Sequence, residues 1–137
     1  MCLKVKSRVR PEHAKMDIVC YKILAKHYNG QILTSPIWRE CWWRIGETKF
    51  NFEEAIGCRI GNMREFGKGL FHVFTNKHDA LQATGHDGYL NRANLFGVRT
   101  VLYECVIPKG TKYYTGVDGD GTLNYGTTAL KIIKEVK

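Results

Sequence analysis

Four basic side chains alternate with other residues near the start of the sequence. Residues 3–10 read Leu-Lys-Val-Lys-Ser-Arg-Val-Arg, so Lys4, Lys6, Arg8 and Arg10 occupy every second position. In a strand, residues two apart point to the same face and lie about 6.6 Å apart. The pattern therefore predicts a row of positive charge that suits a phosphate backbone or an acidic protein surface. Cations on an edge strand also discourage aggregation, and this second explanation stays open.

Metal and nucleophile chemistry are not favoured by the spacing of the candidate side chains. Histidines and cysteines occur, but they match no common zinc pattern, and no local signature indicates a Cys–His nucleophile. They include His72, His78, His86, Cys58 and Cys105. We expect no metal site.

The segment Asp118-Gly-Asp-Gly-Thr-Leu-Asn superficially resembles a calcium-binding loop. Leu123 stands where such a loop needs glycine, and Ala129 stands where it needs a bidentate glutamate. The segment therefore predicts a hairpin turn and no calcium site.

A glycine turn precedes an aromatic stretch in the middle of the chain. Gly67-Lys68-Gly69 leads into Leu70-Phe71-His72-Val73-Phe74, and neither a P-loop nor a Rossmann glycine motif occurs in the sequence. Glycine permits close approach of the backbone to a ligand, so we predict a nucleotide cleft lined by Lys68, Phe71 and His72. Because a strand alternates its faces, one of Phe71 and His72 should be exposed. The alternative is an ordinary loop whose apolar neighbours enter the core.

This stretch, residues 65–81, resembles the G-x-G-[IV]-Y-F…A segment of ADP-ribosyltransferases, particularly the poly(ADP-ribose) polymerase-like branch. Residues 100–110 look like the strand and turn that follow it in that family. With the flanking residues, the stretch that resembles the family is residues 65–115. It implies NAD as a cofactor, with Phe71 at the position of the family's nicotinamide-stacking tyrosine.

The chain departs from this family at the residues that would bind NAD and catalyse. The His-Gly or Arg-Gly pair of the first strand is replaced by Cys20-Tyr21-Lys22-Ile23, and the late catalytic glutamate falls near Tyr125-Gly126-Thr127. An oxocarbenium-like transition state needs a carboxylate to stabilise it. The resemblance therefore implies a degenerate relative, with an ADP-ribosyltransferase that uses unconventional residues as the alternative.

A second resemblance lies in the C-terminal part of the chain. Residues 107–116, Ile-Pro-Lys-Gly-Thr-Lys-Tyr-Tyr-Thr-Gly, together with Tyr125-Gly126 and Lys131-Ile132-Ile133, look like small uncharacterised proteins of bacteriophages and their hosts. This resemblance implies a phage accessory or counter-defence role.

The elements that must position these residues are mostly predicted strands. Apolar or alternating runs predict strands at residues 3–10, 18–24, 98–107 and, against a helical alternative, 129–136. Thr75-Asn76 can cap a helix from Lys77 to Thr84. We expect an α+β fold, a bent or split mostly antiparallel sheet with one or two short helices and an arrangement like that of the ADP-ribosyltransferases. The three tryptophans, Trp38, Trp42 and Trp43, are either core residues or a stacking platform.

Length and composition favour a single domain over residues 1–137. The chain is 44% hydrophobic and 25% charged, its net charge is +8, and its five cysteines are odd in number and scattered. We expect free thiols, a cytoplasmic location and no membrane partner, because no apolar run approaches the length of a span.

These observations together predict a non-enzymatic, phage-type accessory protein that binds a nucleotide, a nucleic acid or an acidic protein surface. Lys4, Lys6, Arg8 and Arg10 would supply the charge, and no cofactor is expected unless the NAD-dependent alternative holds. A structural or protein-interaction module is the third hypothesis.

Overall fold

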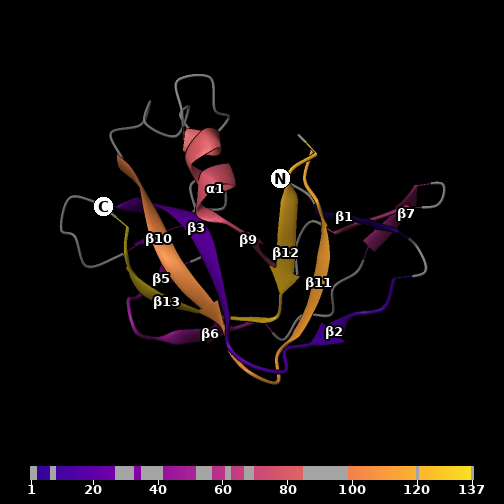
Figure 1. Cartoon of the computed structure of the whole chain (residues 1–137), viewed down its shortest axis with the longest axis horizontal. Coiled ribbons are helices and arrows are strands. Elements are labelled where there is room, and N and C mark those ends of the chain that lie inside the picture. Colours follow the sequence, from indigo (N-terminus) through magenta and orange to yellow (C-terminus); the bar gives the residue numbers. More distant parts are fainter. Residues whose placement is uncertain are drawn as a thin grey trace.

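The structure is a computed structural model that describes residues 3–6, 9–26, 33–34, 42–51, 57–60, 63–66, 70–84, 99–119 and 121–136. Within these ranges the elements follow the chain in this order: β1 (Leu3–Lys6), β2 (Glu12–His13), β3 (Ile18–Lys26), β4 (Leu33–Thr34), β5 (Trp42–Trp43), β6 (Thr48–Phe50), β7 (Gly57–Ile60), β8 (Met63–Phe66), β9 (Phe71–Phe74), α1 (Lys77–Thr84), β10 (Arg99–Ile107), β11 (Lys112–Val117), β12 (Leu123–Thr127) and β13 (Ala129–Glu135) (Figure 1).

All thirteen strands belong to one sheet, in the order β6-β13-β10-β3-β9-β12-β11-β1-β8-β7, with β2, β4 and β5 attached beside this path. Strands β12 and β13 are separated by Thr128 alone, yet β12 pairs with β9 and β11 while β13 pairs with β10 and β6. The run β13-β10-β3-β9-β12 thus begins and ends on one extended stretch of chain, so this part of the sheet must curl around (Figure 1).

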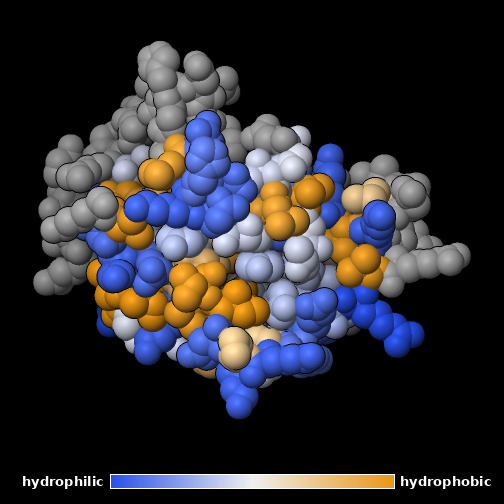
Figure 2. Space-filling view, viewed as in Figure 1, coloured by the Kyte–Doolittle hydropathy of each residue, from blue (hydrophilic) through white to orange (hydrophobic). Residues whose placement is uncertain are grey.

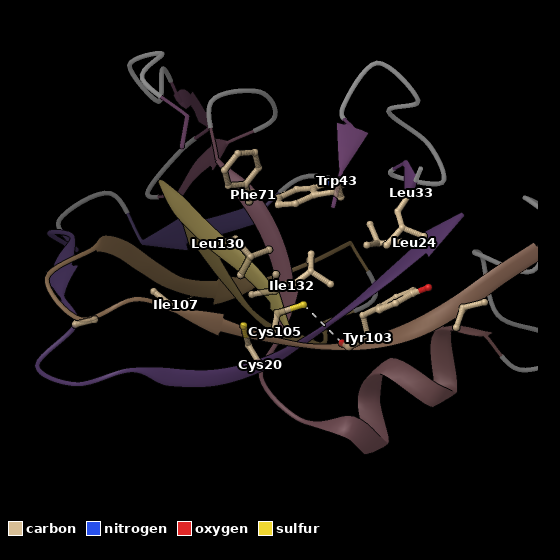
Figure 3. Packing of buried hydrophobic residues seen from close by; sticks show 13 residues of the cluster. Cys20, Leu24, Leu33, Trp43, Phe71, Tyr103, Cys105, Ile107, Leu130 and Ile132 are labelled. Carbon is tan, nitrogen blue, oxygen red and sulfur yellow. Dashed lines mark hydrogen bonds between the residues drawn. The ribbon is translucent and has the colours of Figure 1, made fainter. Parts of the chain in front are cut away.

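The main hydrophobic cluster lies inside this curl. It takes alternate side chains of β3, β10 and β13, as the period of a strand requires, except that Lys22 occupies one inward position of β3. The hairpin β4–β5 adds Leu33 and Trp43, and the Trp43 and Phe71 rings meet edge to face with their centroids 4.8 Å apart (Figure 3). We call the side of the sheet that carries Cys20, Cys105 and Ile132 the inner face.

Helix α1 covers part of the opposite, outer face. The Asn76 side chain accepts a hydrogen bond from the Asp79 backbone N–H at 2.8 Å, which confirms the predicted cap and the predicted helix Lys77–Thr84. Ala80 and Ala83 pack against residues of the sheet that include Ile23. The helix therefore shields only one end of the outer face.

The predicted α+β class is wrong, and the protein is essentially all-β. The part of the chain that the structure describes contains one eight-residue helix against a thirteen-stranded sheet whose paired strands run antiparallel. No ADP-ribosyltransferase-like arrangement is shown. Strands of two to four residues, such as β5, β6, β7 and β8, account for the difference, because so few residues give no recognisable alternation.

Strand β1 is held by a smaller outer-face cluster of Leu3, Val5, Leu70 and Tyr114. Two glycines permit this packing. A Cβ atom at Gly116 would overlap the Lys4 carbonyl oxygen and lie 2.9 Å from Val5 Cγ2, and one at Gly126 would lie 2.6 Å from Leu3 Cδ2. Glycine at these positions therefore lets β1 lie directly against β11 and β12.

We expect Gly116→Ala to lower the free energy of unfolding by about 1–3 kcal/mol, because β1 must move to relieve the overlap. Gly119→Ala is the matched control, since a Cβ atom there meets nothing within 4 Å. Urea unfolding followed by circular dichroism measures both. Equal stability of the two variants would contradict the close packing of β1.

Candidate functional site

The solvent-facing side of β1 carries two lysines at fixed spacing. Leu3 and Val5 are 0% and 2% exposed, so the alternation of the strand places Lys4 and Lys6 in solvent on the other side. Residues two apart on a strand are about 6.6 Å apart. Neither ammonium group has a hydrogen-bond or ion-pair partner among the side chains that the structure describes. Strand β8 pairs with β1 and places Glu65 opposite Lys4. Both lysine side chains are exposed to solvent.

Two tyrosine rings lie on the neighbouring strands β11 and β12, packed against the main hydrophobic cluster. The Tyr113 and Tyr125 rings meet edge to face at 5.5 Å. Tyr113 donates a 2.7 Å hydrogen bond to the Glu12 carboxylate, which raises the pKa of Tyr113 to about 12. These rings therefore belong to the edge of the core, whereas Lys4 and Lys6 point into solvent from β1.

Two members of the predicted row of four cations, Lys4 and Lys6, lie on β1, which ends at Lys6. The Val9 N–H donates a hydrogen bond to the Lys6 carbonyl at 3.0 Å. The alternation over residues 3–10 also predicts that Val9, like Leu3 and Val5, faces the core, but Val9 is 37% exposed, so this prediction is wrong. Arg10 is exposed but lies beyond the strand, and Arg8 lies outside the described residues.

The part of the glycine-aromatic segment that the structure describes, residues 70–74, is buried. Phe71 and His72 are each 8% exposed, so the prediction that one of them would be exposed is wrong. The physical reason is that β9 is covered on both sides: Phe71 packs on Trp43 inside the curl, while Phe74 belongs to the cluster under α1. Lys68 lies outside the residues that the structure describes.

A second group of cations, which the sequence analysis missed, surrounds Trp43. Lys22 Nζ lies 5.7 Å and Lys49 Nζ 5.4 Å from the centroid of the Trp43 ring, within the range of cation–π attraction. Lys22 donates to the backbone carbonyl of His72 at 2.8 Å, and Lys49 donates to that of Trp42 at 2.6 Å. A lysine within the otherwise apolar stretch of β3 was the signal in the sequence.

Two cysteines face each other directly across β3 and β10. Cys20 and Cys105 are paired in register, have free thiols and are 0% exposed (Figure 3). Burial raises the pKa of the Cys105 thiol to about 12 and raises the pKa of Cys20 as well. Both thiols are therefore neutral and unsuited to nucleophilic attack at physiological pH. Cys2 and Cys41 lie outside the described residues.

Asp118 has a structural role in the hairpin between β11 and β12. Its carboxylate accepts hydrogen bonds from the Thr122 N–H at 3.0 Å and the Asn124 amide at 3.2 Å, and Gly121 has a φ of 77°. The predicted hairpin turn is confirmed. Across the described ranges, no three His, Cys, Asp or Glu side chains are grouped so that they could hold a metal ion. Nor is any helix there long and apolar enough to cross a membrane.

Comparison with protein-family models, with curated proteins and with solved structures finds no match for this chain. The ADP-ribosyltransferase and phage resemblances therefore stay predictions. Tyr125-Gly126-Thr127, the segment where the resemblance would put the catalytic glutamate of the ADP-ribosyltransferases, contains no carboxylate. It lies within β12, between β9 and β11.

We expect stability to fall as the pH rises above about 9. In the unfolded chain the two thiols ionise near their ordinary pKa of 9.0, whereas in the fold they stay protonated, so the unfolded state binds fewer protons at high pH. Each thiol adds up to about 1.4 kcal/mol per pH unit to the decline. Urea midpoints between pH 8.5 and 10.5 should fall less steeply for Cys20→Ala/Cys105→Ala than for the unchanged protein. Equal slopes would contradict neutral, buried thiols.

Proposed function

We propose that this protein is a non-enzymatic binding protein that attaches to a polyanion through the solvent-facing side of β1. The observation that carries the proposal is the pair Lys4 and Lys6, which project into solvent side by side from a strand whose other side is buried. Single-stranded nucleic acid carries a regular series of phosphates that two neighbouring ammonium groups can contact, and it is the polyanion that we propose.

The charge of the whole chain acts in the same direction. A net charge of +8 raises the rate of encounter with polyanions at low ionic strength, while the two lysines give the contact a defined place. We infer an accessory role, as in the phage-type hypothesis, in the cytoplasm. The NAD-dependent transferase alternative has no supporting observation in this structure.

One observation favours the protein-interaction alternative. Trp42, Ile45 and Phe50 are each more than half exposed, and hydrophobic side chains also gather over β10 and β13 below α1 (Figure 2). Exposed apolar patches can mark interaction surfaces. This alternative predicts an association that survives charge reversal on β1.

We expect Lys4→Glu/Lys6→Glu to weaken binding of a labelled single-stranded oligonucleotide at least tenfold. Loss of two phosphate contacts should also make the plot of log affinity against log salt concentration shallower by about 1.4. Fluorescence anisotropy at several salt concentrations measures both effects.

The matched control is Lys109→Glu/Lys134→Glu, which changes the net charge equally at two exposed lysines elsewhere. It should retain most of the affinity. Equal losses in the two double variants would show that binding follows net charge alone, and failure of the unchanged protein to bind would also refute the proposal.

A further inference from the structure

Lys22 and Lys49 come from different strands but converge on one indole ring. Lys22 points inward from β3, on the same face as Cys20 and Leu24. Lys49 stands opposite Leu130, a member of the inner cluster, and so also lies on the inner face. The hairpin β4–β5 pairs with β3 and brings the Trp43 ring close to both lysines, with the two ammonium nitrogens 5.7 and 5.4 Å from its centroid.

Both ammonium groups are held in place before any ligand arrives. Each donates to a backbone carbonyl, Lys22 to that of His72 and Lys49 to that of Trp42. An ammonium group has three N–H donors. For Lys49, the Trp42 carbonyl is the one hydrogen-bond acceptor among the described residues. The indole ring offsets part of the repulsion between two like charges, because its face is negative. Both side chains are half-buried, so water screens their charges less than it screens those of surface lysines.

We propose that Lys22, Lys49 and Trp43 form a second anion-binding site, which takes a phosphate group. A phosphate monoester carries about −1.5 to −2 charges at neutral pH and offers three acceptor oxygens, so its charge can balance that of two ammonium groups. A nucleobase is a poorer ligand, because lysines already approach the ring and Phe71 meets its edge. This site lies on the inner face near the Trp43 hairpin and is separate from Lys4 and Lys6 on β1.

The test uses inorganic pyrophosphate as the probe and isothermal titration calorimetry as the measurement. Lys22→Gln and Lys49→Gln should each weaken pyrophosphate binding at least tenfold. Lys131→Gln is the matched control: it removes an equally half-buried lysine, but one that lies between Leu130 and Ile132 and therefore on the outer face. It should change affinity less than twofold. Far-UV circular dichroism verifies that each variant is folded.

A second measurement needs no variant. Pyrophosphate should slow the acetylation of Lys22 and Lys49 by an amine-reactive ester several-fold and leave Lys131 and Lys134 unchanged, as read by peptide mass spectrometry. Absence of binding, or of this protection, would overturn the proposal.

The charge-reversal variant of β1 distinguishes the proposed function at β1 from the second anion-binding site, so each can be refuted without the other. Lys4→Glu/Lys6→Glu should retain pyrophosphate affinity within about twofold while losing oligonucleotide affinity. Loss of pyrophosphate binding in that variant would place the phosphate on β1 and overturn the second site. Retained pyrophosphate binding without oligonucleotide binding would instead refute the proposed function alone.

Discussion

The architecture depends on one bend, at Thr127–Ala129, where a single extended stretch leaves one part of the sheet and enters another. The buried Thr127 hydroxyl donates to the Ala129 carbonyl at 2.9 Å, inside the bend itself. Thr128 donates to the Lys112 carbonyl through its N–H at 3.2 Å and through its hydroxyl at 3.1 Å, and its own carbonyl accepts from the Asn51 N–H at 2.8 Å. The junction thus ties β12 and β13 to the neighbouring segments, and the curl follows from it.

The curl divides the sheet into two chemical environments. Where the strands wrap around, the inner face excludes water, which explains the neutral thiols of Cys20 and Cys105 and the partial burial of Lys22 and Lys49. Beyond β12 the sheet continues to β11 and β1, and there Lys4 and Lys6 are exposed to solvent. The lysines of the curled part and those of β1 therefore have different surroundings.

The sequence predicts those features that depend on local chemistry. Alternation in residues 3–6, the apolar run that becomes β3, the Asn76 cap and the Asp118 turn all have local signals, and the structure confirms each. The fold class and the burial of β9 depend on long-range pairing, which sets what covers each strand. The Lys22–Trp43–Lys49 group was missed for the same reason, because β3, β5 and β6 come together only through the curl and the β4–β5 hairpin.

The central claim is that a polyanion contacts the solvent-facing side of β1. Titration of ¹⁵N-labelled protein with a short single-stranded oligonucleotide, followed by two-dimensional NMR, tests it directly. The account predicts that the largest shifts affect amide signals of β1 and of Val117, its partner in β11, while those of α1 stay unchanged. Shifts confined to α1 and β10, or spread evenly over the exposed lysines, would contradict it.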